Sequence, residues 1–580
     1  MTSFVNQRLS SRTPDIHWLP HSVGCLISYA RKSEFVKQHY KFFTPIYIPH
    51  DYEYYYDILA QTDILCMSNY VWNQKYNDGL AKYYKKINPS GIVVYGGANV
   101  PEHKDYAHTY ALERPYVDIF FVGPGEINIT KFLENINNDI SVHNGAFAQD
   151  FNNVVADKSL YSLPGDQIPN PYLDGVFDEI INSIETKCIG ITLETTRGCP
   201  FKCSFCDWGG LSRSVVNKIS KDDVLKTIEW IYSHGEKIAS VDIIDANLGM
   251  TARDLEIVKQ FEFLYNQTGH YIHITTNGFV KNGSPYLLDT MLTLNRLSRY
   301  SKNIMLSFQT HSQPALEVID RGNIRNERLY PLIDELKKQN LNIKSEMILG
   351  LPGETPDDYK NTLQKDFELG IESMRAYPLV FIVNTPMYET EYRLKHGIKT
   401  KKIRLPYDLH ITRKNYVDKS IKTSCDFNDE SEFEEIEVMY ECNSYTNEDL
   451  ITILKYWWWY HNFYNLGTIK SEITKMNITI GEQIDLFFTK IARGDMPVLS
   501  HILSVYESAV RNIFKPEPIS NIIDVNAVWF FQKGMRTYEA AYFIDHADAV
   551  KSELEQIYGT IDTSHWHNRY AVVLDDIING

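Results

Sequence analysis

Three closely spaced cysteines are the residues of this sequence whose type and spacing point most directly to chemistry. Cys199, Cys203 and Cys206 follow the pattern C-x-x-x-C-x-x-C. Thiolates are soft ligands that suit iron–sulfur clusters, and each corner of such a cluster takes one ligand. Three thiolates on one short loop would therefore bind three irons of a [4Fe–4S] cluster and leave the fourth iron open to another ligand.

The same cysteines could instead form a structural zinc site or a group of buried thiols. A structural zinc ion takes four ligands, and the adjacent Asp207 is poorly placed to be the fourth. No second C-x-x-C pair occurs in the 580-residue chain. The spacing therefore favours the iron–sulfur cluster over zinc.

The cysteine loop resembles that of the radical S-adenosylmethionine (SAM) superfamily. The resemblance implies that the amino and carboxylate groups of SAM bind the open iron, and that an electron from the reduced cluster cleaves SAM to a 5′-deoxyadenosyl radical. It also implies that Phe205, the aromatic residue before the third cysteine, lies near the adenine. A flavodoxin- or ferredoxin-type protein would supply the electron.

A repeated strand-then-helix pattern predicts the element that holds this loop. Strands are expected at 188–192, 240–244, 271–275, 303–308, 343–349 and 373–380, with helices between them. Ser220 and Thr355 have the character of helix N-caps, because acidic residues follow them. Residues 188–390 are therefore predicted to form a partial (βα)6 barrel, the radical SAM core, whose chemistry belongs at the carboxyl ends of its strands.

Polar residues accompany several of these strand ends, and the resemblance assigns them to SAM. SAM is zwitterionic, so its charged and ribose groups need hydrogen-bond partners when they are buried. Each residue alone could equally form a cap or a turn, so the prediction depends on the set. The sequence identifies no catalytic side chain, and His311 is interpreted as a turn residue in preference to a proton donor. The predicted SAM ligands, besides Phe205, are Asp245, Asn247, Asn277, Gln309, Arg321 and Glu346.

Short apolar runs alternate with amphipathic stretches ahead of the barrel and predict a Rossmann-like domain over residues 1–140. Strands are expected at 45–49, 64–68, 91–95 and 118–122, and helices at 78–87 and 128–137. Glycine turns after parallel strands lie where ligands bind. These turns resemble the cobalamin-binding domain that precedes many radical SAM cores. The resemblance implies cobalamin contacts at Ser68, Gly96, Gly97, Gly125 and Glu126.

One feature of that cobalamin group is missing. The signature Asp-x-His-x-x-Gly supplies a histidine to the cobalt, and here Asp15 and His17 begin a match that Pro20 breaks. Some members of the group lack this histidine, so the resemblance still implies cobalamin. The alternative is a degenerate Rossmann-like domain kept for packing or substrate capture.

The rest of the chain is expected to be a linker over residues 141–187 and a mainly α-helical domain over residues 391–580. Residues 396–446 are polar, and the acidic run 426–437 is interpreted as a solvated face or loop. Helices are expected at 447–465, 474–492 and 496–512. Five consecutive aromatic residues, 456–460, would point all round a helix, so most are expected to serve packing.

Composition limits the setting of the reaction. The formal charge is −16 and no long Lys/Arg run occurs, which disfavours a nucleic-acid substrate. The cysteines outside the loop lack paired spacing, which favours a reducing compartment over a disulfide framework. No uncharged apolar run reaches the roughly 18 residues of a membrane span. The sequence therefore predicts a cytoplasmic protein without a membrane contact.

These observations predict an α/β enzyme that cleaves SAM reductively and abstracts hydrogen from an unreactive carbon of a small-molecule or peptide substrate. With cobalamin between the domains, the enzyme would transfer a methyl group to that carbon. Two alternatives stay open. One is a cobalamin-independent radical SAM enzyme, catalysing a rearrangement or oxidation, with a degenerate first domain. The other is a non-catalytic iron–sulfur protein for electron transfer or binding.

Overall fold

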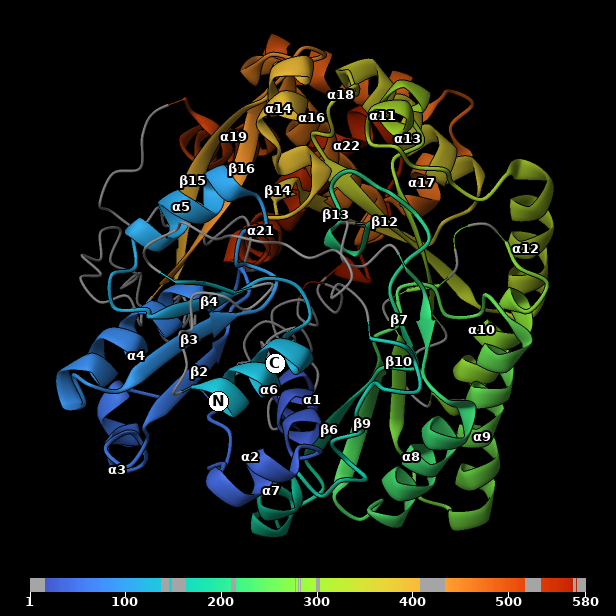
Figure 1. Ribbon diagram of the computed structural model, residues 1–580. Helices are drawn as coiled ribbons and strands as arrows, with labels where there is room; N and C mark the ends of the chain where they lie inside the picture. The colour runs from blue at the N-terminus through green and yellow to red at the C-terminus, as the bar shows by residue number, and fades with distance from the viewer. Residues whose placement is uncertain are drawn as a thin grey trace.

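Three groups of elements make up the computed structural model (Figure 1): a blue sheet on the left, green parallel strands on the right and orange-red helices at the top. Asn277, one of the predicted SAM ligands, lies outside the residues that the structure describes. Those residues are 16–48, 50–136, 146–148, 163–209, 215–276, 278–279, 281, 283–298, 303–406, 433–516, 534–566 and 570.

The N-terminal sheet has the strand order β2-β3-β4-β5, with β2, β3 and β4 parallel and β5 antiparallel at one edge. Helices connect the parallel strands, and buried apolar residues cover both faces of the sheet, as parallel strands require. The carboxyl ends of β2, β3 and β4 therefore meet at one edge. The elements are β2 (Ile64–Ser68), α4 (Gln74–Ile87), β3 (Ile92–Gly96), α5 (Lys104–Leu112), β4 (Ile119–Phe121), α6 (Gly125–Asn135) and β5 (Ala146–Ala148).

Most predictions for this region are confirmed. The strands expected at 64–68, 91–95 and 118–122 are β2, β3 and β4, and the expected helices are α4 and α6 with earlier starts. The strand expected at 45–49 is wrong, because the described residues 45–48 belong to no sheet. Prolines at 45 and 49 lack the N–H that a strand ladder needs, which explains the error.

The barrel strands form two parallel sheets with the orders β1-β6-β9-β10 and β11-β12-β13. In the described residues no hydrogen bonds join β10 to β11, so an open seam separates the two halves. The first half has its own buried core, whereas the second half shares one with the C-terminal helices. The strands are β1 (His17–Trp18), β6 (Ile189–Leu193), β9 (Ile238–Ile243), β10 (His273–Thr276), β11 (Asn303–Gln309), β12 (Asn342–Leu349) and β13 (Ser373–Pro378).

The six strands predicted for the barrel are therefore confirmed in position, with two differences. The last predicted strand, 373–380, is divided: β13 ends at Pro378, and β14 (Val380–Phe381) pairs antiparallel with β16 (Phe433–Glu441) in another sheet. The strand β1 is an addition to the predicted barrel, and it places His17, the histidine of the incomplete Asp-x-His-x-x-Gly match, beside β6.

Helices cover the outside of the barrel strands (Figure 1). Thr355 caps α13 in a reciprocal capping box with Asp358, as its sequence predicts. Ser220 precedes α8 at the N-cap position without a side-chain cap hydrogen bond. The helices are α7 (Asp178–Ser183), α8 (Lys221–Ser233), α9 (Ala252–Thr268), α10 (Leu287–Leu297), α11 (Gln313–Val318), α12 (Asn326–Lys338) and α13 (Pro356–Glu368).

The interpretation of the acidic run 426–437 as a solvated face or loop is wrong for residues 433–437, the part of the run that the structure describes. β15 (Lys399–Pro406) and β16 (Phe433–Glu441) form an antiparallel sheet with the order β14-β16-β15. Alternate residues of β16, Glu434, Ile436 and Val438, are buried, so the acidic run contains a strand of period two. The charges obscured that period.

The C-terminal helices pack on the barrel half that contains β12. Trp458, Trp459 and Tyr460 are at most 1% exposed, which confirms that this aromatic run serves packing. The helix expected at 474–492 is divided, because Thr479 forms a capping box that starts a new helix. The elements are α14 (Thr390–His396), α16 (Asn447–Trp459), a π-helical turn (Tyr460–Asn465), α17 (Lys470–Lys475), α18 (Ile480–Arg493), α19 (Pro497–Phe514), α21 (Gly534–Asp545) and α22 (Ala547–Tyr558).

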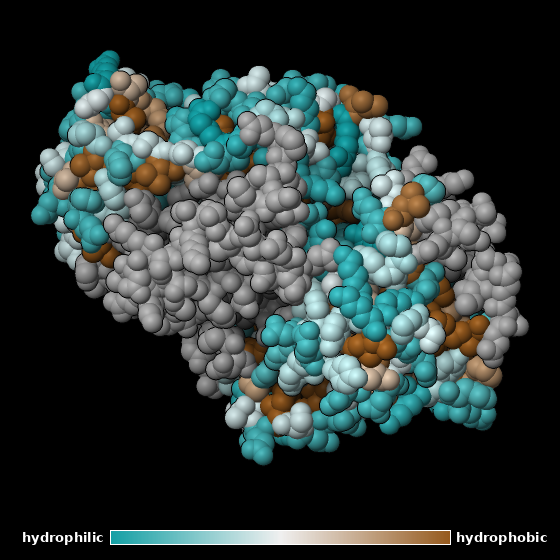
Figure 2. All heavy atoms as spheres, turned by 90° about the vertical axis from the view of Figure 1, so that its left-hand side faces the viewer, coloured by the Kyte–Doolittle hydropathy of each residue, from teal (hydrophilic) through white to brown (hydrophobic). Residues whose placement is uncertain are grey.

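The N-terminal helices α1 (His21–Ala30) and α2 (Glu34–His39) complete the fold, and α1 packs between α6 and β6 (Figure 1). Figure 2 shows the face that contains the N-terminal sheet, where hydrophobic residues among those described occur in scattered groups between hydrophilic ones. No described helix is both long and apolar enough to cross a membrane.

Candidate active site

The cysteine loop follows β6 and the short strand β7 (Thr196–Arg197), which pairs with β8 (Asn217–Lys218). Backbone bonds fix the loop to two distant parts of the barrel. The Ser204 amide donates to the Ile319 carbonyl at 2.9 Å, and the Ser204 carbonyl accepts from the Met387 amide at 2.8 Å. Cys199 and Cys203 are 3% exposed. The barrel therefore holds the thiols at the carboxyl end of its strands, as predicted.

The three thiols fit a cluster in their chemistry. They are free, and no disulfide joins the described cysteines. No three described His, Cys, Asp or Glu side chains converge on a single metal ion. A cubane does not require such convergence, because each of its thiolates binds a different iron. Burial raises the pKa of the Cys206 thiol, and the nearby Lys281 ammonium opposes that shift.

Two of the predicted SAM ligands touch the cysteines themselves. Asn247 Nδ2 lies 3.1 Å from Cys199 Sγ, and Arg321 Nη1 lies 3.9 Å from Cys203 Sγ. Arg321 Nε also donates to the Phe308 carbonyl at 3.1 Å, which fixes the guanidinium at the end of β11. The Oδ1 of Asn247 is buried without a hydrogen-bond partner among the described residues, so it can accept a bond from a ligand.

Asp245 has a structural use that the sequence did not reveal. Its carboxylate accepts from the backbone amides of Thr195 at 2.7 Å and Thr196 at 3.0 Å, and from the Thr195 hydroxyl. Burial raises the pKa of Asp245 to about 6, although these hydrogen bonds oppose the shift. The residue therefore ties the end of β6 to the end of β9, directly before the cysteine loop.

The remaining predicted SAM ligands lie at or near the same end of the barrel. Glu346 on β12 accepts from the Ser307 hydroxyl of β11 at 3.0 Å. Gln309 ends β11 with a φ of 69°, a conformation that few residues other than glycine adopt. Phe205 is partly buried against the core that contains β11 and β12. Their contact with SAM stays a prediction.

His311 behaves as a structural residue. Its Nε2 lies 2.8 Å from Oδ1 of Asp366, a fully buried carboxylate on α13. Asp366 also accepts a short hydrogen bond from Ser345 on β12. His311 therefore attaches the turn after β11 to α13, in keeping with the turn interpretation.

The predicted cobalamin residues lie along the carboxyl edge of the N-terminal sheet. Ser68 pairs with Gly96 where β2 and β3 end. Gly97 has a φ of 100°, and a Cβ there would lie 2.6 Å from the Asn69 backbone, so the turn requires glycine. Gly96 and Gly125 are half-buried, so part of the backbone at this edge is exposed.

Glu126 is engaged by the cysteine loop. Its Oε1 lies 2.7 Å from Nη1 of Arg197, two residues before Cys199. Arg197 also pairs with Glu194 at the end of β6, where Nη2 lies 2.9 Å from Oε2. The side chains of both carboxylates are 6% exposed. This buried ion-pair network joins the N-terminal α/β unit to the loop, and nothing in the local sequence predicted it.

The network continues into α1. His21 Nε2 lies 3.9 Å from Glu194 Oε2 and 3.5 Å from Cys25 Sγ, and the ring stacks on Tyr172. Burial acts to lower the pKa of His21, but Cys25 and Glu194 outweigh it and raise that pKa to about 10. For Glu194, burial is opposed by Arg197 and His21, which hold its pKa down at about 2. The structure therefore favours an ionised Glu194 facing a protonated His21.

Two further contacts hold the N-terminal unit in place. Asn384, after β14, accepts from the Glu102 amide at 2.7 Å and donates to the carbonyls of Ala98 and Val100 at 3.0 and 2.9 Å. Glu434 of β16 accepts from the amides of Lys75 at 2.9 Å and Tyr76 at 3.5 Å, in the first turn of α4. These contacts hold the carboxyl edge of the N-terminal sheet against β16 and against the segment after β14.

Comparison with known proteins defines the class to which this barrel and its cysteine loop belong. Residues 193–365 match the family model of the Radical SAM superfamily. That segment contains the three cysteines, the strands β9 to β12 and the predicted SAM ligands. Residues 193–365 therefore form a radical SAM domain, which confirms the resemblance seen in the sequence.

Two curated relatives extend the similarity beyond the barrel. The chain is 29% identical over 418 residues to the cobalamin-dependent radical SAM methyltransferase TokK of Streptomyces tokunonensis, covering 70% of this chain and 59% of TokK. It is also 29% identical over 400 residues to the 2-(S-pantetheinyl)-carbapenam-3-carboxylate methyltransferase of Streptantibioticus cattleyicolor, covering 67% of this chain and 57% of that enzyme. The chain thus spans less than two thirds of the length of either relative.

A solved structure shares the fold. The cobalamin-dependent SAM radical enzyme OxsB, with aqua-cobalamin and SAM bound, superimposes with a TM-score of 0.52 at 14% identity, covering 100% of this chain and 83% of OxsB. At 14% identity the likeness shows the mixed α/β fold alone. The α/β class of the predicted fold is therefore confirmed, whereas the division into domains stays a prediction.

Proposed function

We propose that this protein is a radical SAM enzyme that cleaves SAM reductively at a [4Fe–4S] cluster held by Cys199, Cys203 and Cys206. The cluster, when bound, supplies one electron and an open iron at which SAM binds. The observation that carries the proposal is the position of three free thiols at the carboxyl end of a parallel barrel that matches the superfamily. A flavodoxin- or ferredoxin-type protein is proposed as the electron donor.

The chain's own residues support SAM binding beside the loop. The unpartnered Oδ1 of Asn247 can accept from the SAM ammonium, and the carboxylate of Glu346 supplies a further acceptor at the end of β12. Arg321 places a buried guanidinium 3.9 Å from Cys203 Sγ, beside the atoms that would hold the cluster. Phe205, Gln309 and Asn277 complete the proposed set, and Asp245 acts by positioning the loop.

We further propose that the N-terminal α/β unit, residues 1–140, binds cobalamin and that the enzyme is a methyltransferase. Both curated relatives are named as methyltransferases, and one name states cobalamin dependence. Cobalamin, when bound, would carry the methyl group that is transferred to an unreactive substrate carbon. The accessible backbone at Gly96 and Gly125, beside Ser68, supports this site. The contact of Glu126 with Arg197 supports a position near the cysteine loop.

The proposed division of the chain follows from these roles. Residues 141–187 link the cobalamin-binding unit to the radical SAM core, residues 188–390, and residues 391–580 form a mainly helical domain that covers one barrel half. The antiparallel sheet of β14, β15 and β16 lies across the junction between core and C-terminal domain. The relatives' substrate class favours a small molecule over a peptide, since one of them is named for a carbapenam carboxylate.

Anaerobic reconstitution of the full chain with iron and sulfide tests the first proposal. We expect about four irons per chain, and 5′-deoxyadenosine or S-adenosylhomocysteine once SAM and dithionite are added. Cys203→Ser should lose cluster and products, whereas Cys188→Ser, a matched change outside the loop, should retain both. A cluster-loaded protein that leaves SAM intact would instead indicate an iron–sulfur protein for electron transfer or binding.

Purification in the presence of hydroxocobalamin tests the methyltransferase proposal. We expect a corrinoid absorbance that stays with the protein through gel filtration. The second candidate is a cobalamin-independent radical SAM enzyme, and one observation favours it. Gly97 contacts the Asn69 backbone and Glu126 pairs with Arg197, so both residues have structural roles that do not require cobalamin. A protein that cleaves SAM but stays free of corrinoid would decide for this second candidate.

A further inference from the structure

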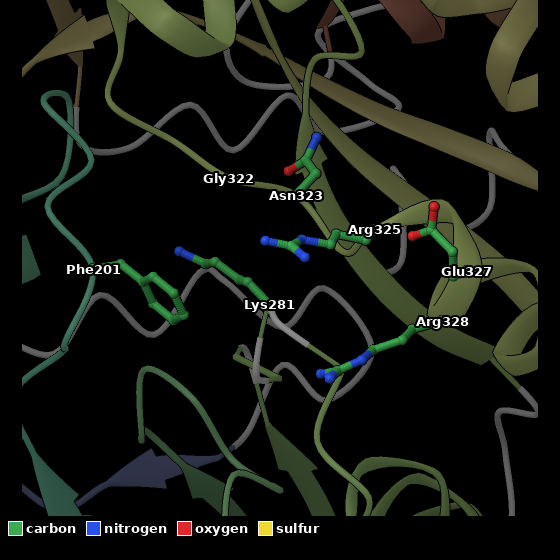
Figure 3. A pocket seen from close by; sticks show the side chains of 7 residues that line it. All are labelled: Phe201, Lys281, Gly322, Asn323, Arg325, Glu327 and Arg328. Carbon is green, nitrogen blue, oxygen red and sulfur yellow. The ribbon is translucent and has the colours of Figure 1, made fainter.

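A cavity of about 580 Å³ lies beside the cysteine loop. Its walls include Phe201, two residues after Cys199, together with Lys281 from the segment after β10 and Arg325 and Arg328 at the start of α12 (Figure 3). These segments follow β10 and β11, the neighbouring barrel strands that do not pair. The cavity thus lies at the open seam of the barrel, on the side where the strands end. Pockets that bind small molecules have about this volume, roughly 300–1,000 Å³.

The cavity is strongly basic. Lys281, Arg325 and Arg328 contribute three cations, and Glu327 is the acidic residue of its lining. Figure 3 shows the Lys281 ammonium and the Arg325 guanidinium extending into the same space beside Phe201, while the Glu327 carboxylate lies on the other side of Arg325. Neither Lys281 nor Arg325 forms an ion pair with a carboxylate among the described residues.

Other contacts hold the walls in this arrangement. The Lys281 Nζ lies 5.8 Å from the centre of the Phe201 ring, close enough for a cation–π contact. Arg328 Nη1 donates to the Gly283 carbonyl at 3.1 Å, which anchors that side chain to the segment after β10. The thirteen-residue helix α12 also directs the positive end of its dipole at this region.

Cations that share a cavity repel one another unless an anion lies between them. A guanidinium binds a carboxylate or phosphate through two parallel hydrogen bonds, and a lysine ammonium adds a flexible third contact. The lining therefore has the chemistry to bind an anionic group. Because the positive charges line the walls of the cavity, a small anion inside it can contact all of them. The surface of a globular protein could contact only the residues at the cavity entrance.

We infer that this cavity binds a carboxylate or phosphate of the substrate, and so selects anionic substrates. The inference rests on the proposed function, because the substrate of a radical SAM enzyme must reach the barrel mouth beside the cluster loop. SAM itself has one carboxylate, which the resemblance to the superfamily assigns to the open iron. Lys281 and Arg325 are thus left for a second anion, and the substrate brings it.

Calorimetric titration of the full chain with inorganic pyrophosphate tests the site without turnover. Wild-type protein should bind the probe at low ionic strength, more weakly as salt is added. The double variant Arg325→Gln, Arg328→Gln should bind at least about tenfold more weakly, because charge-assisted hydrogen bonds are lost. Arg493→Gln, on the exposed end of α18 in the C-terminal helices, is the matched control and should bind as wild type does. A wild-type protein that does not bind pyrophosphate would overturn the inference.

Parallel titrations with SAM identify the source of the anion. We expect the double variant to bind SAM, and to form 5′-deoxyadenosine with dithionite, as wild type does. Competition between pyrophosphate and SAM, with both affinities reduced in the variant, would assign the cavity to SAM and overturn the inference. The double variant could instead bind pyrophosphate as wild type does, while flavodoxin reduces its cluster more slowly. That result would assign these cations to binding of the electron donor and would also overturn the inference. Probe binding by a wild-type protein that forms no 5′-deoxyadenosine would overturn the proposed function alone and leave the anion site standing.

Discussion

Arg197 Nη1 lies 2.7 Å from Oε1 of Glu126, and this ion pair joins the first turn of α6 to the residue two positions before Cys199. The same guanidinium holds Glu194 at the end of β6. A displacement of α6 would therefore act directly on the loop that carries the thiols. We infer that this contact fixes the distance between the two proposed cofactor sites.

The change Glu126→Gln tests that contact. Glutamine keeps one acceptor for Arg197 but loses the charge, so we expect a loss of about 1–2 kcal/mol in the free energy of unfolding. The midpoint of thermal unfolding should fall by about 1 °C per kcal/mol, because the unfolding entropy of a chain of this length is large. Glu134→Gln is the matched control, because Glu134 is exposed on the same helix. Equal midpoints for the two variants would show that the ion pair contributes nothing to stability.

The pair of His21 and Glu194 predicts a particular pH dependence. The pKa of His21 is raised to about 10 in the folded protein, above its ordinary value near 6.5. Its contribution to stability is therefore complete below pH 6.5 and is lost as pH rises towards 10. The lowered pKa of Glu194, about 2, gives the opposite dependence, with a contribution present above pH 4.5 and lost as pH falls towards 2.

Urea unfolding of His21→Gln across this range provides the measurement. The difference in stability between wild type and variant should be largest near pH 6 and should shrink between pH 7 and pH 10. His39→Gln changes an exposed histidine on α2 and should show no such trend. A constant difference across the whole range would contradict the protonated state assigned to His21.

The positions of the barrel strands and of the cysteine loop could be predicted because they depend on local signals. The period of apolar residues predicts β9 and β12. The spacing of Cys199, Cys203 and Cys206, all within eight residues, indicates a cluster-binding loop. Thr355 and Asp358, three positions later, likewise predict the start of α13 because they form its capping box. Such signals need no knowledge of the rest of the chain.

The residues that hold the site together could not be predicted, because their partners are remote. Glu434 lies in an acidic run that looks solvated, yet the amides that it caps belong to α4, 359 residues earlier. Glu126 resembled a ligand contact, and its partner Arg197 is 71 residues away. Asp245 is predicted to bind SAM, and that contact stays a prediction. Its carboxylate also accepts hydrogen bonds from two backbone amides after β6, about 50 residues earlier, which the sequence does not reveal.

The buried carboxyl of Glu354 predicts a second pH dependence of stability. Its carboxyl is fully buried after β12, accepts from the Thr310 hydroxyl at 2.7 Å and has an Oε2 without a partner among the described residues. Burial raises its pKa to about 8. The folded protein therefore binds a proton more tightly than the unfolded chain, and stability falls as pH rises from about 4.5 to 8.

Glu354→Gln should remove that part of the pH dependence, because glutamine cannot ionise. Relative to wild type, the variant should gain stability on the order of 2–4 kcal/mol between pH 5 and pH 8. The measurement is urea unfolding at these two pH values, with the exposed Glu368→Gln at the end of α13 as the control. A variant that loses stability equally at both pH values would show that Glu354 is ionised in the folded protein.

Asn384 offers a test of how the N-terminal edge is held. Its φ of 69° lies in the left-handed region, and its side chain bonds three backbone groups between residues 98 and 102. Asn384→Gly keeps the conformation and loses the hydrogen bonds, which should cost about 1–3 kcal/mol at this partly buried site. Asn384→Ala should cost about 1 kcal/mol more, because alanine adopts a positive φ less readily than glycine.

Hydrogen exchange locates the effect of these two variants. The Glu102 amide donates to Asn384 Oδ1 at 2.7 Å, so its exchange should accelerate in both variants. The Ile92 amide, which donates to the Asp63 carbonyl at 2.9 Å at the far end of the same sheet, is the internal reference and should keep its wild-type rate. If Glu102 also kept its rate, some other contact would hold the segment after Gly97. Acceleration at Glu102 alone would show that Asn384 holds the turn bearing Gly96 and Gly97 against the barrel, independently of the ion pair between Glu126 and Arg197.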